Sequence, residues 1–185
     1  MNRLLENDHR ANLLIAVFSF LLLLGSYKLN EYLDPYVLYA PGAGLIFVPA
    51  GVKLLCLLVG GLPAILGVLT ASAYISIGLW NDNTFLSTFS LATVSVLTYY
   101  SSVLMVTRSL KICADLSNLK YWHIVLLSTI ASVLNGFGLN LAYYSQNVTT
   151  TSEFLSKGAA MALGDFMGCC IIVMIFNLTI TAIRR

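Results

Sequence analysis

Long apolar runs, separated by short polar stretches, are the dominant pattern of this 185-residue chain. An apolar run of about 20 residues is long enough to cross the hydrocarbon core of a bilayer as a helix. The pattern predicts six such helices, at residues 12–27, 42–59, 62–80, 85–106, 124–144 and 159–183. The predicted fold is therefore an all-α, polytopic integral membrane bundle that forms one domain over residues 1–185.

Glycine and proline mark two of the boundaries. Only Gly60 and Gly61 separate the second and third runs, and Pro63 lies in the first turn of the third run, so we expect a tight helical hairpin there. Pro49 interrupts the second run, which predicts a kinked or broken helix. Irregular backbone at membrane depth is tolerated where it is buried in protein or lines a cavity. The break therefore predicts an outward-facing polar recess.

The composition supports the same class. Hydrophobic residues make up 58% of the chain and charged residues only 10%, whereas about 25% of residues are charged in a typical soluble domain. Six spans with short connections leave little room for a soluble catalytic or receiver domain. We therefore expect any output activity to come from a partner chain.

The basic residues predict the orientation. With six spans, both termini lie on one side of the membrane, and the cytoplasmic side is the one with more Lys and Arg. The terminal side has seven basic residues, namely Arg3, Arg10, Arg108, Lys111, Lys120, Arg184 and Arg185, and the other side has Lys28 and Lys157. This bias predicts a multi-pass protein of the cell (inner) membrane with both termini in the cytoplasm. The connections 29–41, 81–84 and 145–156 then face outward. Aromatic residues typical of an interfacial belt lie near the predicted span ends, namely Trp80, Trp122, Tyr36, Tyr39, Tyr99, Tyr100, Tyr143 and Tyr144.

The sequence contains no pattern typical of enzymatic or metal chemistry. Of its four cysteines, Cys56, Cys169 and Cys170 lie in apolar runs and Cys113 lies in a predicted cytoplasmic loop. There is no C-x-x-C, no G-x-S-x-G, no H-E-x-x-H and no phosphate-binding glycine loop, and the chain has only two histidines. These observations predict a non-enzymatic protein without a metal, a cofactor or a nucleic-acid partner.

Four polar residues at predicted membrane depth are the candidate functional or structural cluster. Asp165 lies in the last apolar run, where a carboxylate must be paired, neutralised or facing water. Its predicted depth is about 9–10 Å below the outer surface. Lys53, Asn135 and Asn140 are expected in the same half of the bilayer. Three roles are open for the cluster: a structural lock formed by a Lys53 ion pair or a hydrogen bond, a ligand, ion or proton site, and a docking surface for another membrane subunit.

Small residues follow a helical row in the last run. Ala160, Gly164 and Gly168 are spaced by four, and Gly136 and Gly138 make the preceding helix thinner. Such rows let helices approach closely in membranes. They predict either close packing around Asp165 or a homodimer face.

Two segments are similar to motifs of the membrane-associated sensor (MASE-type) integral domains. Residues 47–55, FVPAGVKLL, followed by Gly60, Gly61 and the sequence LPAILG at 62–67, resemble their helical hairpin. Residues 163–168, LGDFMG, resemble the Gly-Asp-x-x-Gly that closes those domains. The resemblance implies a sensor-like module in which Lys53 and Asp165 match the family pattern. Those domains usually have more spans and carry a cytoplasmic cyclase or kinase, so the resemblance implies a free-standing, truncated relative.

Two other functions fit the same architecture. The vitamin-binding S components of energy-coupling-factor transporters are similar in span number, cytoplasmic termini and outward recess. Their first helix commonly carries alanine-x-x-x-alanine, whereas Ala11 and Ala16 here are five positions apart. An accessory subunit that fills a groove in a larger membrane complex is the third hypothesis. The expected partners are thus the lipid bilayer, a membrane or signalling protein, and, for solute capture, a small-molecule ligand.

Overall fold

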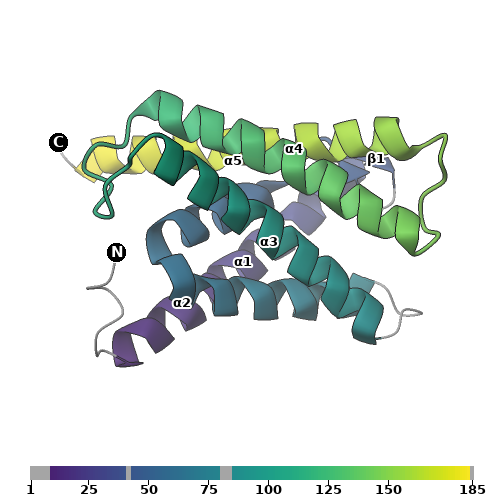
Figure 1. Ribbon diagram of the computed structural model, residues 1–185, viewed down its shortest axis with the longest axis horizontal. Coiled ribbons are helices and arrows are strands. Elements are labelled where there is room, and N and C mark those ends of the chain that lie inside the picture. The colour runs from purple at the N-terminus through teal and green to yellow at the C-terminus, as the bar shows by residue number, and fades with distance from the viewer. Residues whose placement is uncertain (1–8, 41–42, 80–84, 184–185) are drawn as a thin grey trace.

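The computed structural model describes residues 9–40, 43–79 and 85–183, most of which belong to long helices (Figure 1). The elements are α1 (His9–Val37), β1 (Leu38–Ala40), β2 (Ala43–Gly44), α2 (Val48–Leu79), α3 (Phe85–Ser109), α4 (Tyr121–Ser145) and α5 (Phe154–Ile183). Five helices in this described part are long and apolar enough to cross a membrane. The chain is thus a helical protein with the properties of a membrane bundle. The predicted loop 81–84, together with Trp80, Arg3, Arg184 and Arg185, lies outside the described residues.

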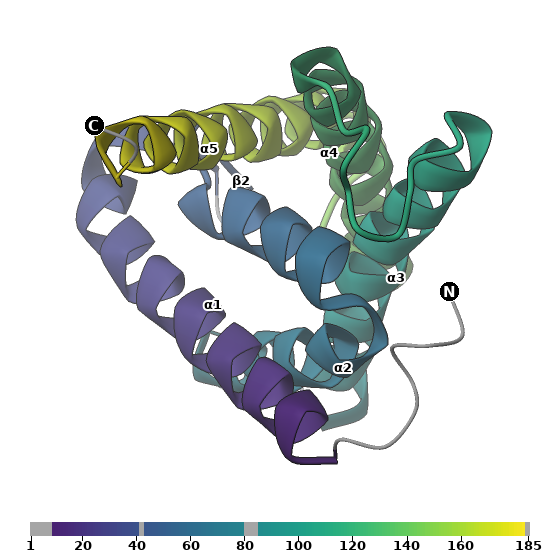
Figure 2. The same cartoon turned by 90° about the vertical axis from the view of Figure 1, so that its left-hand side faces the viewer.

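The helix α2 contains the region for which the sequence predicted two separate spans. Gly61 interrupts it with φ 58° and ψ −139°, a backbone conformation that residues with a side chain rarely adopt. Figure 2 shows the sharp bend that this conformation produces within α2. The described chain therefore has five long helical elements, and the non-helical Gly61 divides α2 into two helical parts, where the sequence predicted a hairpin.

The helical segments run alternately between two ends of the molecule (Figure 1). The beginning of α1, the bend of α2, the α3–α4 connection and the end of α5 lie at one end, which we call the terminal end. The end of α1 and the α4–α5 connection lie at the other end, which we call the opposite end.

The end of α1 differs from the prediction, which placed a loop at residues 29–41. The helix continues to Val37 because its polar residues bond within the helix. Asn30 Nδ2 donates a hydrogen bond of 2.7 Å to Asp34 Oδ1, and Lys28 Nζ lies 3.0 Å from the Glu31 carboxylate. Such pairs, three or four residues apart, stabilise a helix. A short antiparallel ribbon follows, in which Leu38 pairs with Gly44.

The chain then enters the bundle without regular structure before α2 begins. Leu45 N donates to Val37 O over 2.8 Å, and Phe47 N donates to Gly164 O over 3.0 Å. Val48 N donates to the Asn30 side chain over 2.9 Å. The predicted break near Pro49 is thus present as a helix start, with proline in the first turn, where its missing N–H costs no hydrogen bond. The predicted helix began at residue 42, whereas α2 begins at Val48, because residues 43–47 are not helical.

The row of small residues on α5 faces this non-helical segment. A Cβ atom added to Gly164 would overlap the carbonyl of Gly44, and one added to Gly168 would overlap the carbonyl of Phe47. Ala160 is buried in a cluster that includes Ala43. The sequence left two uses open for this row, close packing around Asp165 and a homodimer face. The structure contains close packing within the chain.

A substitution at Gly168 tests this packing. Gly168→Ala should lower the free energy of unfolding by about 1–3 kcal/mol, since the new methyl group has no room beside the Phe47 backbone. Gly25→Ala is the matched control, because a Cβ at Gly25 meets no atom within 4 Å. Thermal unfolding in detergent micelles measures both variants, and equal melting temperatures for the two would contradict the packing.

Candidate functional site

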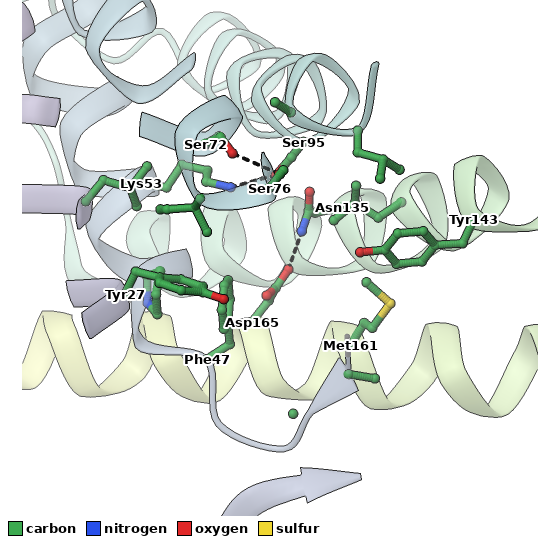
Figure 3. A pocket seen from close by; sticks show the side chains of 18 of the residues that line it. Tyr27, Phe47, Lys53, Ser72, Ser76, Ser95, Asn135, Tyr143, Met161 and Asp165 are labelled. Carbon is green, nitrogen blue, oxygen red and sulfur yellow. Dashed lines mark hydrogen bonds between the residues drawn. The ribbon is translucent and has the colours of Figure 1, made fainter. Parts of the chain in front are cut away.

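A cavity of about 430 Å³ lies between the helices, and all five helices contribute residues to its wall (Figure 3). Its volume falls in the range of about 300–1,000 Å³ that is common for small-molecule sites. The polar residues of the wall are Tyr27, Asp34, Lys53, Ser72, Ser76, Ser95, Asn135, Tyr143 and Asp165.

The non-helical segment before α2 creates part of this wall. Ala43, Gly44 and Phe47 border the cavity, and Pro49 follows them at the start of α2. Non-helical backbone of this kind is typical at membrane depth where it lines a cavity. The ring of Phe47 packs edge-on against Tyr27, with 6.5 Å between ring centroids.

Lys53 enters the cavity wall from α2. Its side chain is only 6% exposed, and Nζ donates a hydrogen bond of 2.6 Å to Ser95 Oγ on α3. Nζ also lies 5.3 Å from the centroid of the Tyr99 ring, a distance that allows a cation–π contact. Its partners are therefore a hydroxyl and a ring, and the side chain does not extend to the surface.

Asp165 belongs to a hydrogen-bonded chain that crosses three helices. Thr98 Oγ1 on α3 donates to Asn135 Oδ1 over 3.1 Å, and Asn135 Nδ2 on α4 donates to Asp165 Oδ2 over 2.6 Å. Asp165 is 4% exposed. It follows the first residue of α5 by eleven positions, or about 16 Å of helix. The predicted span began at residue 159, which placed Asp165 six positions after its start, whereas α5 begins at Phe154.

The structure does not pair Lys53 with Asp165. Both residues are described, yet Lys53 Nζ is not within 4.0 Å of the Asp165 carboxylate. Of the two locks that the sequence left open, the structure contains the hydrogen bond from Asn135 and not the ion pair. The amine and the carboxylate border the same cavity, each held by an uncharged neighbour.

Asn140 lies apart from this group. Its Nδ2 donates to the carbonyl of Phe154 at the beginning of α5, and its side chain does not line the cavity. The structure therefore brings together Lys53, Asn135 and Asp165, while Asn140 joins α4 to the start of α5.

Several wall residues were missed by sequence reasoning. Ser72 is 8% exposed, and its Oγ has no hydrogen-bond partner. The hydroxyl groups of Tyr27 and Tyr143 point from two sides toward the space beside Asp165 (Figure 3). The sequence predicted that Tyr99 and Tyr143 belong to an interfacial aromatic belt. Both side chains are instead buried inside the bundle. The one sequence feature that could have indicated these wall residues was the four-residue spacing of Ser72 and Ser76, which places both on one helical face.

The chemistry of the cavity is that of a polar binding site with apolar walls. One amine, two carboxylates (Asp34 and Asp165), an amide and several hydroxyls line the cavity among aliphatic and aromatic side chains. Within the described ranges, no group of three or more His, Cys, Asp or Glu is placed to hold a metal ion. This arrangement can orient a small polar molecule by hydrogen bonds and charge.

The sequence matches no protein-family model, and comparisons with curated proteins and with solved structures also found no match. The geometry of the cavity and the residues that form it are therefore the basis for inferring a function.

Substitution of Asp165 separates hydrogen bonding from packing. Asp165→Asn keeps an oxygen that accepts from Asn135, so its stability should stay close to wild type. Asp165→Leu leaves the buried amide without an acceptor and should lower the free energy of unfolding by about 1–3 kcal/mol. Thermal unfolding in nanodiscs measures both, with Leu163→Ile on the exposed face of α5 as the control. Wild-type stability of Asp165→Leu would contradict a stabilising role for the hydrogen bond between Asn135 and Asp165.

Proposed function

We propose that this chain is a non-enzymatic, ligand-binding module of the cell (inner) membrane that acts through a partner protein, as a sensor-like or accessory subunit. The observation that carries the proposal is the cavity that brings Lys53, Asn135 and Asp165 together at membrane depth. Buried ionisable residues inside membrane helices are costly and commonly mark functional sites.

The proposal includes six membrane crossings with both termini in the cytoplasm. The second and third crossings are the two parts of α2 on either side of Gly61. Residues 48–60 give about 20 Å of helix, less than the hydrocarbon thickness of about 30 Å. The ribbon and the segment 45–47 complete this crossing.

The charge distribution supports this orientation. The described basic residues of the terminal end are Arg10, Arg108, Lys111 and Lys120, and those of the opposite end are Lys28 and Lys157. The cavity is bordered by Asp34 and Leu38, which lie at the end of α1 and the start of the ribbon. With cytoplasmic termini, the cavity opens to the outside.

The resemblance to MASE-type domains supports the sensor-like role. The motif residues lie at the cavity or hold it together: Pro49, Lys53 and Asp165 line it, and Gly164 and Gly168 bring α5 against the segment before α2. A sensor of this kind transmits ligand occupancy to a partner through its helices.

Solute capture, in the manner of an energy-coupling-factor S component, is the second candidate. The observation in its favour is that all five helices contribute residues to the wall of one cavity, so that a solute in it would contact every helix. This function predicts an ATPase partner, whereas the sensor-like function predicts a signalling or membrane protein.

Native mass spectrometry of the protein, gently extracted from its own membrane, tests the proposal. We expect a stoichiometric small molecule, a co-purifying chain, or both. A co-purifying ATPase would indicate solute capture, and a co-purifying signalling or membrane protein would indicate the sensor-like function.

A cavity-filling variant is the matched comparison for that measurement. Ser72→Phe should remove the small molecule, since the new ring occupies the cavity, while Leu163→Phe on the lipid-exposed face should retain it. Wild-type protein with neither a ligand nor a partner would contradict the proposed function.

A further inference from the structure

We propose that the cavity binds a small zwitterion, a molecule with a primary ammonium group, a nearby anionic group and an apolar remainder, such as an apolar α-amino acid. This inference rests on the proposed function, because it names the ligand class of the same cavity. It is carried by the separate placement of Lys53 and Asp165 in one wall.

Lys53 supplies the recognition of the anionic group. An ammonium group has three N–H donors, and among the described residues Ser95 is the one hydrogen-bond acceptor of Lys53. The other two donors are available to a ligand carboxylate. Ser72, whose Oγ is buried in the same wall without a partner, adds a further hydroxyl.

Asp165 supplies the recognition of the ammonium group. A carboxylate has about four lone-pair sites on two oxygens, and Asn135 occupies one of them on Oδ2. Asn135 also fixes the direction of the carboxylate, because its own Oδ1 is held by Thr98. The Tyr99 hydroxyl also lies beside this carboxylate. The lone pairs that Asn135 and Tyr99 leave are available to a ligand N–H.

A zwitterion meets both groups at once. A simple anion would be attracted by Lys53 but repelled by Asp165 and Asp34, and a simple cation would be attracted by these two carboxylates but repelled by Lys53. Like charges brought together at a binding site are strongly unfavourable. The apolar part of the wall, formed by Phe47, Leu91 and Leu139 among others, suits an apolar side group.

Two sources carry this chemistry. One is a free amino acid that enters from the water, and the other is the headgroup of phosphatidylethanolamine, which combines an ammonium group with a phosphate. The inference concerns the chemistry that they share, and the experiment separates the sources.

The experiment measures equilibrium binding of radiolabelled L-leucine and L-phenylalanine to the full chain in phosphatidylglycerol nanodiscs. The competitors are the matching compounds that lack one charged group: 4-methylpentanoic acid and 3-methylbutan-1-amine for leucine, and 3-phenylpropanoic acid and 2-phenylethylamine for phenylalanine. We expect at least one amino acid to bind and each of its single-charge analogues to bind about tenfold more weakly or worse.

Variants assign the two groups. Lys53→Gln should weaken binding of the amino acid at least about tenfold and remove the discrimination against the amine. Asp165→Asn should remove the discrimination against the acid. Lys157→Gln is the matched control, because Lys157 is also 6% exposed and lies 5.7 Å from the Tyr143 ring, yet does not line the cavity.

The lipid source is tested by adding phosphatidylethanolamine to the nanodiscs. Two results would support the zwitterion chemistry and assign it to the lipid. One is loss of amino-acid binding when phosphatidylethanolamine is added. The other is retention of phosphatidylethanolamine by the wild-type protein but not by Lys53→Gln. Equal binding of amino acids and their single-charge analogues would overturn the inference and leave the ligand-binding function standing. The inference would also be overturned if neither the amino acids nor the lipid bound. The proposed function itself fails only if native mass spectrometry finds the wild-type protein with neither a ligand nor a partner.

Discussion

The close approach of α5 to the non-helical segment before α2 is the contact on which the cavity depends. In a bilayer, backbone N–H and C=O groups need partners within the protein. Phe47 N finds one in the carbonyl of Gly164, and this approach is open only because Gly164 and Gly168 have no side chains. The contact holds the non-helical segment inside the bundle, and it fixes Asp165, the neighbour of Gly164, at the cavity wall.

The same contact explains why the charges remain apart. Because α2 begins only at Val48, Lys53 lies in its second turn and reaches Ser95 on α3. Asp165 instead bonds to Asn135 on α4. Two buried ionisable groups are thus positioned by different helices around one space. This arrangement differs from a structural ion pair, in which the two charges would contact each other directly and leave no room for a ligand.

The sequence predicted the class and several break points correctly, because these follow from local properties. Apolar runs identify membrane helices, and the effects of Gly61 and Pro49 on the backbone are intrinsic to those residues. The loop predicted at residues 29–41 was wrong, because hydropathy does not reveal that Asn30 and Asp34 bond to each other within a helix. The helix therefore extends to Val37.

The site was only partly predictable for a related reason. Buried charge is rare enough in a membrane helix to single out Lys53 and Asp165 from the sequence. Serine and tyrosine are common in such helices, so Ser72 and Ser95 became notable only when the fold placed them beside the same cavity. Asn140 was an equally good candidate by residue type, but the direction of its side chain depends on the packing of α4 against α5.

We propose that the polar cavity reaches membrane depth from the outside. The most direct measurement is labelling of a Ser72→Cys variant by a charged, membrane-impermeant methanethiosulfonate reagent added outside intact cells, in a background with the native cysteines replaced by serine or alanine. The account predicts modification, because Ser72 lines the cavity. It predicts no modification of a Leu163→Cys variant, whose exposed side chain does not line the cavity and would be covered by the proposed bilayer. A Ser72→Cys variant that reacts only after the cells are opened, or not at all, would contradict the account.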